Sequence, residues 1–170
     1  RVYFFGNSLN NDYSSNHKYQ GQLAQIELTS DAVIGLTYDG QVVYLGSQKN
    51  SYSTIPENMG KVVDIAATAS TMAAVNDQGE VFVWGNISTK WKEGAVPETE
   101  SKIVSIQGGR YHYTGLTEDG KAVAWGANQF KQSTVPDDLE QVKVSRMYTG
   151  YFQNYAVSED GKIKAWGLKG

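Results

Sequence analysis

The chain has 170 residues, 40% of them hydrophobic, and a formal net charge of −3 at pH 7. This length is sufficient for one domain with a substantial core, and a net acidic chain lacks the basic excess that is typical of nucleic-acid-binding proteins. The sequence has no cysteine, which excludes disulfides and thiolate metal sites, and no apolar run of the roughly 18 residues that a membrane helix needs. We therefore expect neither nucleic-acid binding nor membrane insertion.

A tight-turn signal followed by a short strand recurs along the chain. Its clearest copies are Glu-Asp-Gly-Lys-Ala-Val-Ala-Trp-Gly at 118–126 and Ser-Glu-Asp-Gly-Lys-Ile-Lys-Ala-Trp-Gly at 158–167, and the copies at 77–85 and 38–46 are more divergent. The copies end at glycines that are 40, 39, 41 and 41 residues apart, namely Gly6, Gly46, Gly85, Gly126 and Gly167. Self-similarity at a fixed period in this range is typical of propellers and solenoids.

The chain opens with the second half of this unit at residues 1–6, which we expect to form a strand. The first repeat, residues 7–46, begins with a polar loop that contains His17. Strands are expected at 22–29 and 32–37, because apolar and β-branched residues are frequent there.

Three further repeats follow, at 47–85, 86–126 and 127–167. The prolines of the chain stand 10 to 12 residues after a closing glycine, at Pro56, Pro97 and Pro136. Apolar runs after the prolines predict the first strands of these three repeats at 61–67, 102–106 and 141–144. Further runs predict the second strands of the last two repeats at 113–117 and 154–158. Asp-Gly is expected to close a type I′ hairpin into the third strand. A short fourth strand in the proline-bearing segment is left open.

Trp84, Trp125 and Trp166 occupy one register position in the repeats, which Leu45 and Phe5 fill in the divergent copies. Each repeat buries its faces only against its neighbours. We therefore expect these side chains to pack between repeats.

The order of these signals resembles the repeat of the regulator of chromosome condensation (RCC1) β-propellers, particularly its short bacterial form. The best copy is 103–126, where residues 108–112 read Gly-Gly-Arg-Tyr-His and match a Gly-Gly-x-x-His element. Residues 67–70 and 145–149 depart from that element. Residues 125–128 (Trp-Gly-Ala-Asn), followed by Ser-Thr-Val-Pro, are also similar to the repeat of the bacterial β-lactamase inhibitor protein II.

This resemblance implies an all-β propeller with blades of about 40 residues, and a structural hydrogen bond rather than catalysis for His112. A WD40 propeller has a similar period, but the Trp-Asp and Gly-His signatures of WD40 repeats are missing. Relatives usually form seven blades, whereas residues 1–170 form one propeller region with four repeats. The sequence predicts five strands that end in a closing glycine, but only four strands of each other type in the repeat. We therefore expect an arc of a larger ring, completed by further sequence or by another chain, and the lack of an initial methionine agrees with this.

Aromatic residues gather at expected loop positions, two lysines flank one of them, and together they are the candidates for a protein-binding surface: Lys90, Trp91, Lys92, Tyr111, Phe130, Tyr148, Tyr151 and Phe152. Tyrosine and tryptophan are enriched in protein interfaces. Trp91 and Phe130 have no counterpart in the other repeats and are the strongest candidates. Each tyrosine could equally pack between blades.

The sequence contains no spaced Ser-His-Asp set and no phosphate-binding glycine loop. The acidic pairs at 98/100 and 137/138 are interpreted as solvated. We therefore expect a non-enzymatic chain with no catalytic residues, no metal and no cofactor. The first hypothesis is a protein-binding module that uses the loops at one rim. The alternative is a structural building block of a larger assembly, such as a virion or a surface appendage, completed by other chains.

Overall fold

The computed structural model describes residue 19, residues 21–46 and residues 49–169. The expected strand at 1–6, with Phe5, and the loop residue His17 lie outside these residues. In the described part of the chain, twelve strands form four three-stranded antiparallel sheets, which we call blades 1 to 4. The all-β prediction is confirmed.

Each blade contains three strands that are consecutive in the sequence. The strands are, for blade 1, β1 (Leu23–Leu28), β2 (Val33–Thr37) and β3 (Val42–Tyr44); for blade 2, β4 (Val62–Ala67), β5 (Thr71–Asn76) and β6 (Val81–Gly85); for blade 3, β7 (Ile103–Gly108), β8 (His112–Thr117) and β9 (Ala122–Gly126); and for blade 4, β10 (Val144–Thr149), β11 (Gln153–Ser158) and β12 (Ile163–Gly167). The first strand of every blade carries a bulge at the same place near its start.

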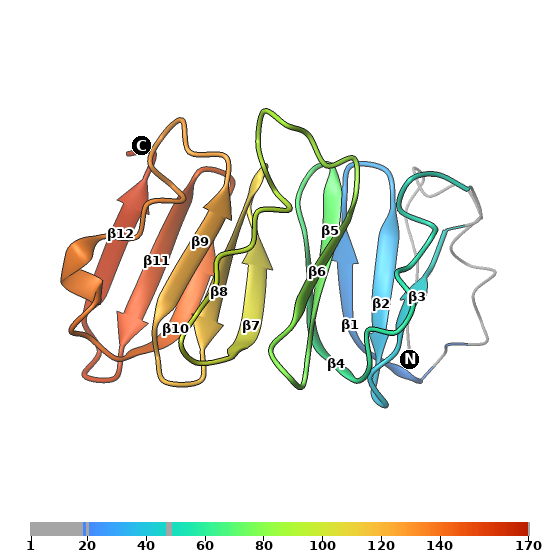
Figure 1. Ribbon diagram of the computed structural model, residues 1–170, viewed down its shortest axis with the longest axis horizontal. Helices are drawn as coiled ribbons and strands as arrows, with labels where there is room; N and C mark the ends of the chain where they lie inside the picture. Colours follow the sequence, from blue (N-terminus) through green and yellow to red (C-terminus); the bar gives the residue numbers. More distant parts are fainter. Residues whose placement is uncertain (1–18, 20, 47–48, 170) are drawn as a thin grey trace.

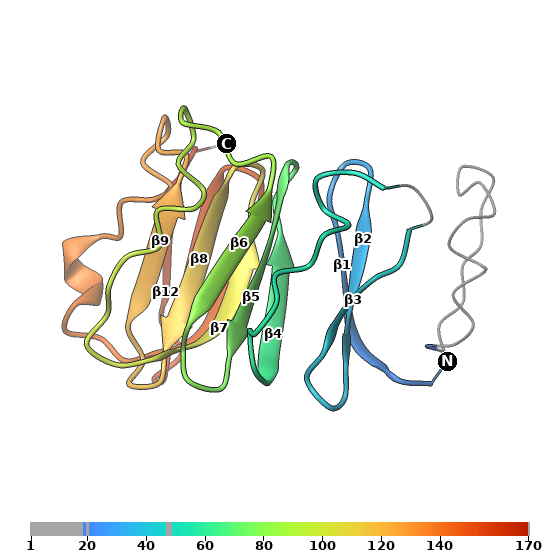
Figure 2. The ribbon, with the colours of Figure 1, turned by 45° about the vertical axis from the view of Figure 1, so that its right-hand side comes forward.

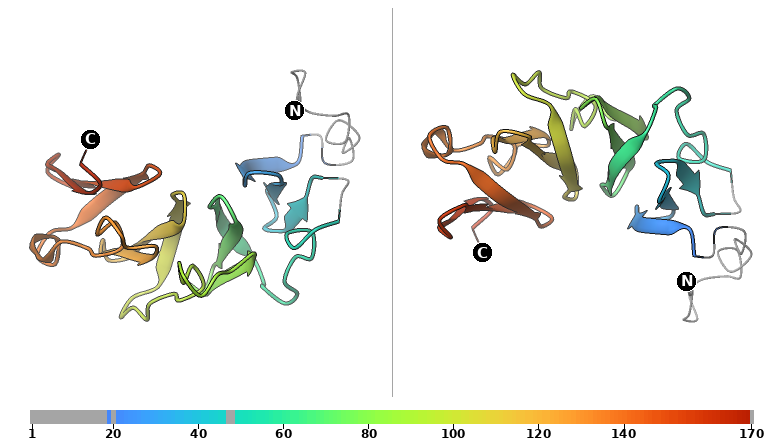
Figure 3. Two further views of the ribbon diagram at one scale, coloured as in Figure 1. Left: turned by 90° about the horizontal axis from the view of Figure 1, so that it is seen from above. Right: turned by 90° about the horizontal axis from the view of Figure 1, so that it is seen from below.

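The four blades stand side by side in an arc (Figure 1), with the faces of neighbouring sheets toward one another (Figure 2). Viewed along the strands, the arc is open, and the first strand of each blade lies on its concave side (Figure 3). Neighbouring blades contact each other through these first strands.

Apolar side chains of adjacent blades fill the space between the sheets. Three buried clusters lie between blades 1 and 2, blades 2 and 3, and blades 3 and 4, and each contains one tryptophan of the later blade: Trp84, Trp125 and Trp166. Burial of such a ring stabilises the interface by roughly 2–3 kcal/mol. Leu45 is also buried in blade 1. The predicted packing between repeats is therefore confirmed for the three tryptophans, and for Leu45 the structure shows burial alone.

The same tryptophans also fix the loops that lead into their blades. The indole N–H of Trp125 donates to the carbonyl oxygen of Glu93 at 2.9 Å, and that of Trp166 donates to the carbonyl oxygen of Gln132 at 3.1 Å. Trp84 donates to Tyr52 in the same way at 3.2 Å. Each of these loops is thus fixed by one hydrogen bond to the blade that follows it.

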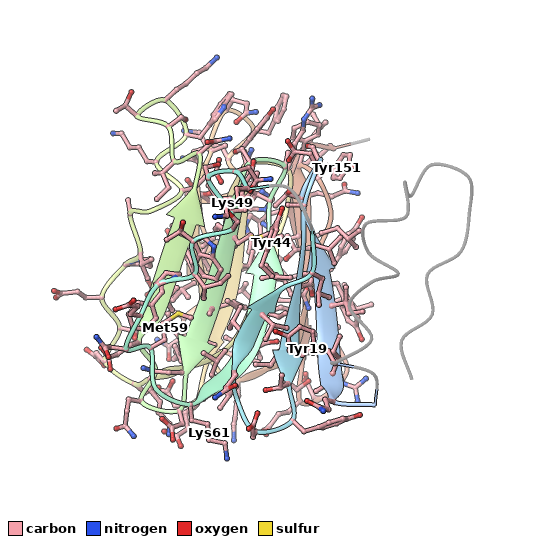
Figure 4. The ribbon with its side chains drawn as sticks, turned by 90° about the vertical axis from the view of Figure 1, so that its right-hand side faces the viewer. Tyr19, Tyr44, Lys49, Met59, Lys61 and Tyr151 are labelled. Atoms are coloured by element: carbon pink, nitrogen blue, oxygen red, sulfur yellow. The ribbon has the colours of Figure 1, made fainter. Side chains whose placement is uncertain are left out.

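The two ends of the blades differ in construction. One end, the loop rim, carries the turns between the first and second strands and the long loops after the third strands. The other end, the turn rim, carries the turns between the second and third strands and the segments that enter the first strands. Figure 4 shows Tyr151 at the loop rim and Lys61 at the turn rim.

Backbone hydrogen bonds connect adjacent blades at the loop rim. The amide of Ser30 donates to Ala69, that of Ala69 donates to Arg110, and that of Arg110 donates to Tyr151, at 3.3, 2.8 and 3.0 Å. These four residues hold equivalent positions in the four blades, so one row of turns runs along the whole rim.

The predicted type I′ turns are wrong. In blade 1, Gly40 has φ +90° but Asp39 lacks the positive φ that a type I′ turn requires. The Gly40 amide donates to the Thr37 carbonyl and the Thr37 amide to the Gln41 carbonyl, which makes a three-residue loop. The Thr37 hydroxyl accepts the Gln41 amide at 2.9 Å. This side-chain hydrogen bond stabilises the longer turn, and residues Asn76, Thr117 and Ser158 repeat it.

Two other expectations also require correction. The first strand of blade 4 is Val144–Thr149, not 141–144, because the 3₁₀-helix Asp137–Leu139 and the turn after it occupy the region after Pro136. Residues 145–149 are therefore strand, and Gly150 occupies the place of Gly109. The proline-bearing segments form no fourth strand in the described residues, since proline lacks the N–H that strand pairing needs.

Candidate functional site

The loop between β6 and β7 carries Trp91 at the loop rim and is anchored by a buried carboxylate. Glu93 is completely buried and accepts hydrogen bonds from the hydroxyls of Thr68 at 2.6 Å, Ser70 at 3.1 Å and Thr71. The amide of Trp91 donates to the Ser88 hydroxyl at 3.0 Å. Because Glu93 and Ser88 hold the chain on both sides of Trp91, this residue has a defined position.

The turn between β7 and β8 is set by two glycines that permit close approach. A Cβ at Gly108 would lie 1.9 Å from the carbonyl oxygen of Ala67 in the preceding blade, and one at Gly109 would lie 2.1 Å from the His112 ring. The Gly-Gly element is therefore required by packing. It presses the turn against blade 2 and presents the next two residues, Arg110 and Tyr111, at the rim.

His112 and its partner are buried below this turn. Its Nε2 lies 2.8 Å from Oδ1 of Asn154, which joins blade 3 to blade 4. Tyr113 and Thr71 make the corresponding contact between blades 3 and 2 at 2.7 Å. Burial lowers the pKa of the His112 imidazole, and the hydrogen bond to Asn154 opposes this shift. The expected structural hydrogen bond of His112 is present.

A stack of two aromatic rings forms the part of the rim that belongs to blade 3. The rings of Trp91 and Tyr111 are 5.0 Å apart and nearly parallel, at 8°. Lys90 Nζ lies 4.5 Å from the centre of the Trp91 ring, and the guanidinium of Arg110 lies 5.4 Å from that of Tyr111. Such cation–π contacts each contribute about 0.5–1 kcal/mol at exposed sites.

A second group of rings forms the part that belongs to blade 4. Phe130 packs edge-to-face on Phe152 at 5.3 Å, and Tyr151 lies 6.3 Å from the same ring. Arg110 is also 6.0 Å from Phe152, so it links the two groups. We call the whole set the aromatic row: Lys90, Trp91, Arg110, Tyr111, Phe130, Tyr151 and Phe152.

Six of the eight candidate residues thus lie in one row at one rim, although they come from four separate segments of the chain. Lys92 is exposed in the Trp91 loop but has no contact with the row among its described interactions. Tyr148 does not lie in a loop: it is in β10, opposite Tyr155, and is 50% exposed. Sequence reasoning missed Arg110. Its place beside Tyr111 in a predicted turn was a usable signal, since arginine is enriched in interfaces.

Residues 19, 21–46 and 49–169 contain no group of three metal-ligating side chains placed to hold an ion. No helix in those residues is long and apolar enough to cross a bilayer.

Residues 103–132 match the family model described as the regulator of chromosome condensation (RCC1) repeat. No curated protein matches the sequence significantly. The match covers the one repeat in which the Gly-Gly-x-x-His element and the Asp-Gly turn occur together.

Solved structures similar to this chain include propellers from plants and yeast. The CRINKLY WD40 ectodomain of the Arabidopsis thaliana receptor kinase ACR4 aligns with a TM-score of 0.64 and 22% identity, over 86% of this chain and 50% of that one. Prp20p from Saccharomyces cerevisiae aligns with a TM-score of 0.66 and 21% identity, over 85% and 43%. The computationally designed Ika4 protein aligns with a TM-score of 0.55 and 16% identity, over 88% and 93%.

This chain therefore spans half the length or less of the natural propellers that it resembles here. Identities at this level show the fold alone. The chain has the β-propeller fold with RCC1-like blades, and its likeness to the short bacterial type stays a prediction.

Proposed function

We propose that this chain is a non-enzymatic protein-binding module that contacts its partner with the aromatic row on the loop rim. The observation that carries the proposal is the continuity of the row: Arg110 joins the Trp91–Tyr111 stack to the Phe130–Phe152 pair across two blades. Tryptophan, tyrosine and arginine are the residue types that carry most binding energy in protein interfaces.

The way in which the row is held also supports binding. Glu93 anchors the Trp91 loop, and the backbone hydrogen bond from Arg110 to Tyr151 couples the two turns. A surface that is already ordered loses less conformational entropy on binding than a mobile loop does. The row therefore has the properties of a pre-formed contact surface.

A similar propeller gives independent support. The structure of Prp20p from S. cerevisiae was described together with its binding to Gsp1p and histones, and yeast RCC1 (Prp20) was solved bound to Kap60. These partners belong to that protein. We carry over only the general property, which is that a propeller of this kind binds proteins.

The proposal is tested by placing a photo-crosslinking amino acid at Phe130 in the cells that normally make the protein. Phe130 is 37% exposed and lies at the end of the row. We expect a discrete protein adduct from this position and none from Lys121 on the turn rim, the control. Equal crosslinking from both positions, or none from Phe130, would contradict the proposal.

A second candidate function is a structural building block in which another chain covers the outer face of blade 4, the sheet face that points away from blade 3. Leu116 and Ala122 of blade 3 pack against blade 4, and the equivalent residues of blade 4 are Val157 and Ile163. Ile163 is 69% exposed. An apolar sheet face at a position that elsewhere contacts the next blade favours a protein neighbour there.

This candidate predicts that the purified chain associates through the outer face of blade 4. Light scattering should give a mass above 18.7 kDa, and Ile163→Lys should return it to the monomer value. A monomer at all concentrations tested would exclude self-association, and a crosslink from position 163 to a different protein would then still identify a hetero-assembly.

A further inference from the structure

The charge of the loop rim differs from the charge of the chain as a whole. In blades 3 and 4 the rim consists of residues 86–95, 109–111, 127–134, 150–152 and 168–169. These segments contain five cations, Lys90, Lys92, Arg110, Lys131 and Lys169, and their one carboxylate, Glu93, is buried on threonine hydroxyls. The solvent-facing charge of the rim in blades 3 and 4 is therefore entirely positive, although the net charge of the chain is −3.

Opposite charges are interleaved at the turn rim instead. Lys143 pairs with Glu159 at 3.2 Å, and Lys162 with Asp160 at 3.7 Å. None of the five loop-rim cations forms an ion pair with a carboxylate in the part of the chain that the structure describes. Their charge is thus available to a partner.

The backbone at two of these cations is unfavourable for lysine. Lys92 has φ +56° and Lys131 has φ +62°, in the left-handed region that glycine and asparagine tolerate best. The two residues stand at the same place in their loops, directly before Glu93 and Gln132, whose carbonyl oxygens accept the indole N–H groups. Strained backbone of this kind clusters at functional sites, and here it coincides with two of the rim cations.

Arg110 lies at the centre of this charge. Its guanidinium is next to the rings of Tyr111 and Phe152, and the residue is exposed to solvent. A guanidinium held in this way can bind a carboxylate through two parallel hydrogen bonds.

We propose that the partner of the aromatic row is an acidic protein segment, in which carboxylates contact Arg110 and the flanking lysines, and apolar side chains contact Phe130 and Tyr151. This inference rests on the proposed function and adds the chemistry of the partner. Single-stranded nucleic acid is also anionic, but it binds by stacking bases on free aromatic faces. Trp91 and Tyr111 already stack on each other with Lys90 and Arg110 over their rings, so an acidic protein fits the row better.

The test uses three probes: a glutamate decapeptide with one central tyrosine, the same peptide with glutamine in place of glutamate, and a thymidine decanucleotide. A change in tryptophan fluorescence reports binding at Trp91, because Trp84, Trp125 and Trp166 are buried and cannot contact the probe. We expect the glutamate peptide to change this signal, the glutamine peptide to leave it unchanged, and binding to weaken with salt. NMR signals of the Arg110 side chain should shift in the same titration.

Charge variants separate the rim from nonspecific attraction. The double change Lys90→Gln and Arg110→Gln should weaken glutamate-peptide binding by about tenfold or more. Lys121→Gln with Lys162→Gln removes the same charge from the turn rim and should change the affinity less than about twofold.

The outcomes distinguish this inference from the proposed function. Tighter binding of the thymidine decanucleotide than of the glutamate peptide would overturn the acidic-protein inference in favour of nucleic acid. Absence of glutamate-peptide binding, with a protein crosslink still obtained from position 130, would overturn the partner chemistry alone. Absence of both would remove the proposed function as well.

Discussion

The loop rim has one backbone but two kinds of surface. In blades 1 and 2 the turn position is filled by Ser30 and Ala69, and in blades 3 and 4 it is filled by Arg110 and Tyr151, although all four residues take part in the same row of inter-blade hydrogen bonds. The first pair presents small side chains, and the second pair belongs to the aromatic row.

This difference shows how a repeat protein acquires a site. The blade fold constrains the residues whose backbone or buried side chains connect neighbours, and it leaves the outward side chains of the turns free to vary. A surface confined to two adjacent blades can therefore become specialised without changing the framework that supports it.

The largest effect is expected from a change to the shared framework. Gly108→Ala would place a methyl group 1.9 Å from the carbonyl oxygen of Ala67, so blades 2 and 3 would have to separate. We expect a loss of at least about 3 kcal/mol in the free energy of unfolding, measured by urea denaturation. Gly94→Ala is the matched control, since its Cβ would meet only the Ile87 side chain at 3.5 Å. Similar stability of the two variants would refute the close contact between blades 2 and 3.

A smaller effect is expected from the anchor that connects framework and site. Glu93→Ala removes the carboxylate that accepts from the buried hydroxyls of Thr68 and Thr71 and leaves them only their contacts with each other and with Tyr113, and we expect it to cost roughly 2–4 kcal/mol. The Trp91 loop should also loosen, so near-ultraviolet circular dichroism should lose the Trp91–Tyr111 signal. Glu93→Gln should keep most of both properties, because Gln132 fills the corresponding place in blade 4. A full-strength Trp91–Tyr111 signal in the alanine variant would show that the loop orders itself.

The sequence was sufficient to predict the framework because each blade repeats its signals. The tryptophan register, the strand order and the turn glycines occur several times, so an error in one copy is corrected by the others. The errors arose where a copy departs from the rest, as at residues 141–149, or where a side-chain hydrogen bond such as that of Thr37 selects a longer turn. The aromatic row is not repeated. Its candidate residues could be chosen by type, but only the fold shows that Arg110 lies between Tyr111 and Phe152.

The first strands of the blades also differ between blades 1 and 2 on one side and blades 3 and 4 on the other. Gln107 of blade 3 donates to Met147 at 2.7 Å and accepts the Thr149 amide at 2.9 Å. The equivalent residue of blade 1 is Glu27, whose pKa is raised from an ordinary 4.5 to about 7 by burial and by the nearby Asp64. The interface between blades 1 and 2 therefore contains a group that titrates near neutral pH, and the interface between blades 3 and 4 has an amide in its place.

Because Glu27 holds its proton more tightly in the folded chain, the stability that it contributes is fully present below pH 4.5 and is lost as the pH rises through about 7. Glu27→Gln should remove part of this loss, so the difference between urea midpoints at pH 5 and pH 8 should shrink. Gln107→Glu is the reciprocal variant and should enlarge it. An unchanged pH dependence in Glu27→Gln would mean that Glu27 ionises normally in the folded chain.

The smallest change in stability is expected from the side chain that distinguishes the two halves most clearly. Arg110→Ala gives blade 3 the residue that blade 2 has at Ala69, and the backbone hydrogen bonds to and from this position are kept. The free energy of unfolding should therefore fall only by about 1–2 kcal/mol, which is the contribution of the two cation–π contacts of Arg110, while crosslinking from position 130 should fall sharply because the two ring groups are no longer joined. Ala69→Arg is the control: it adds the same charge where no aromatic row exists and should leave crosslinking unchanged. If Arg110→Ala instead destabilised the fold by clearly more than about 2 kcal/mol and left crosslinking intact, Arg110 would belong to the framework that all four blades share, and the site would have to be sought elsewhere on the rim.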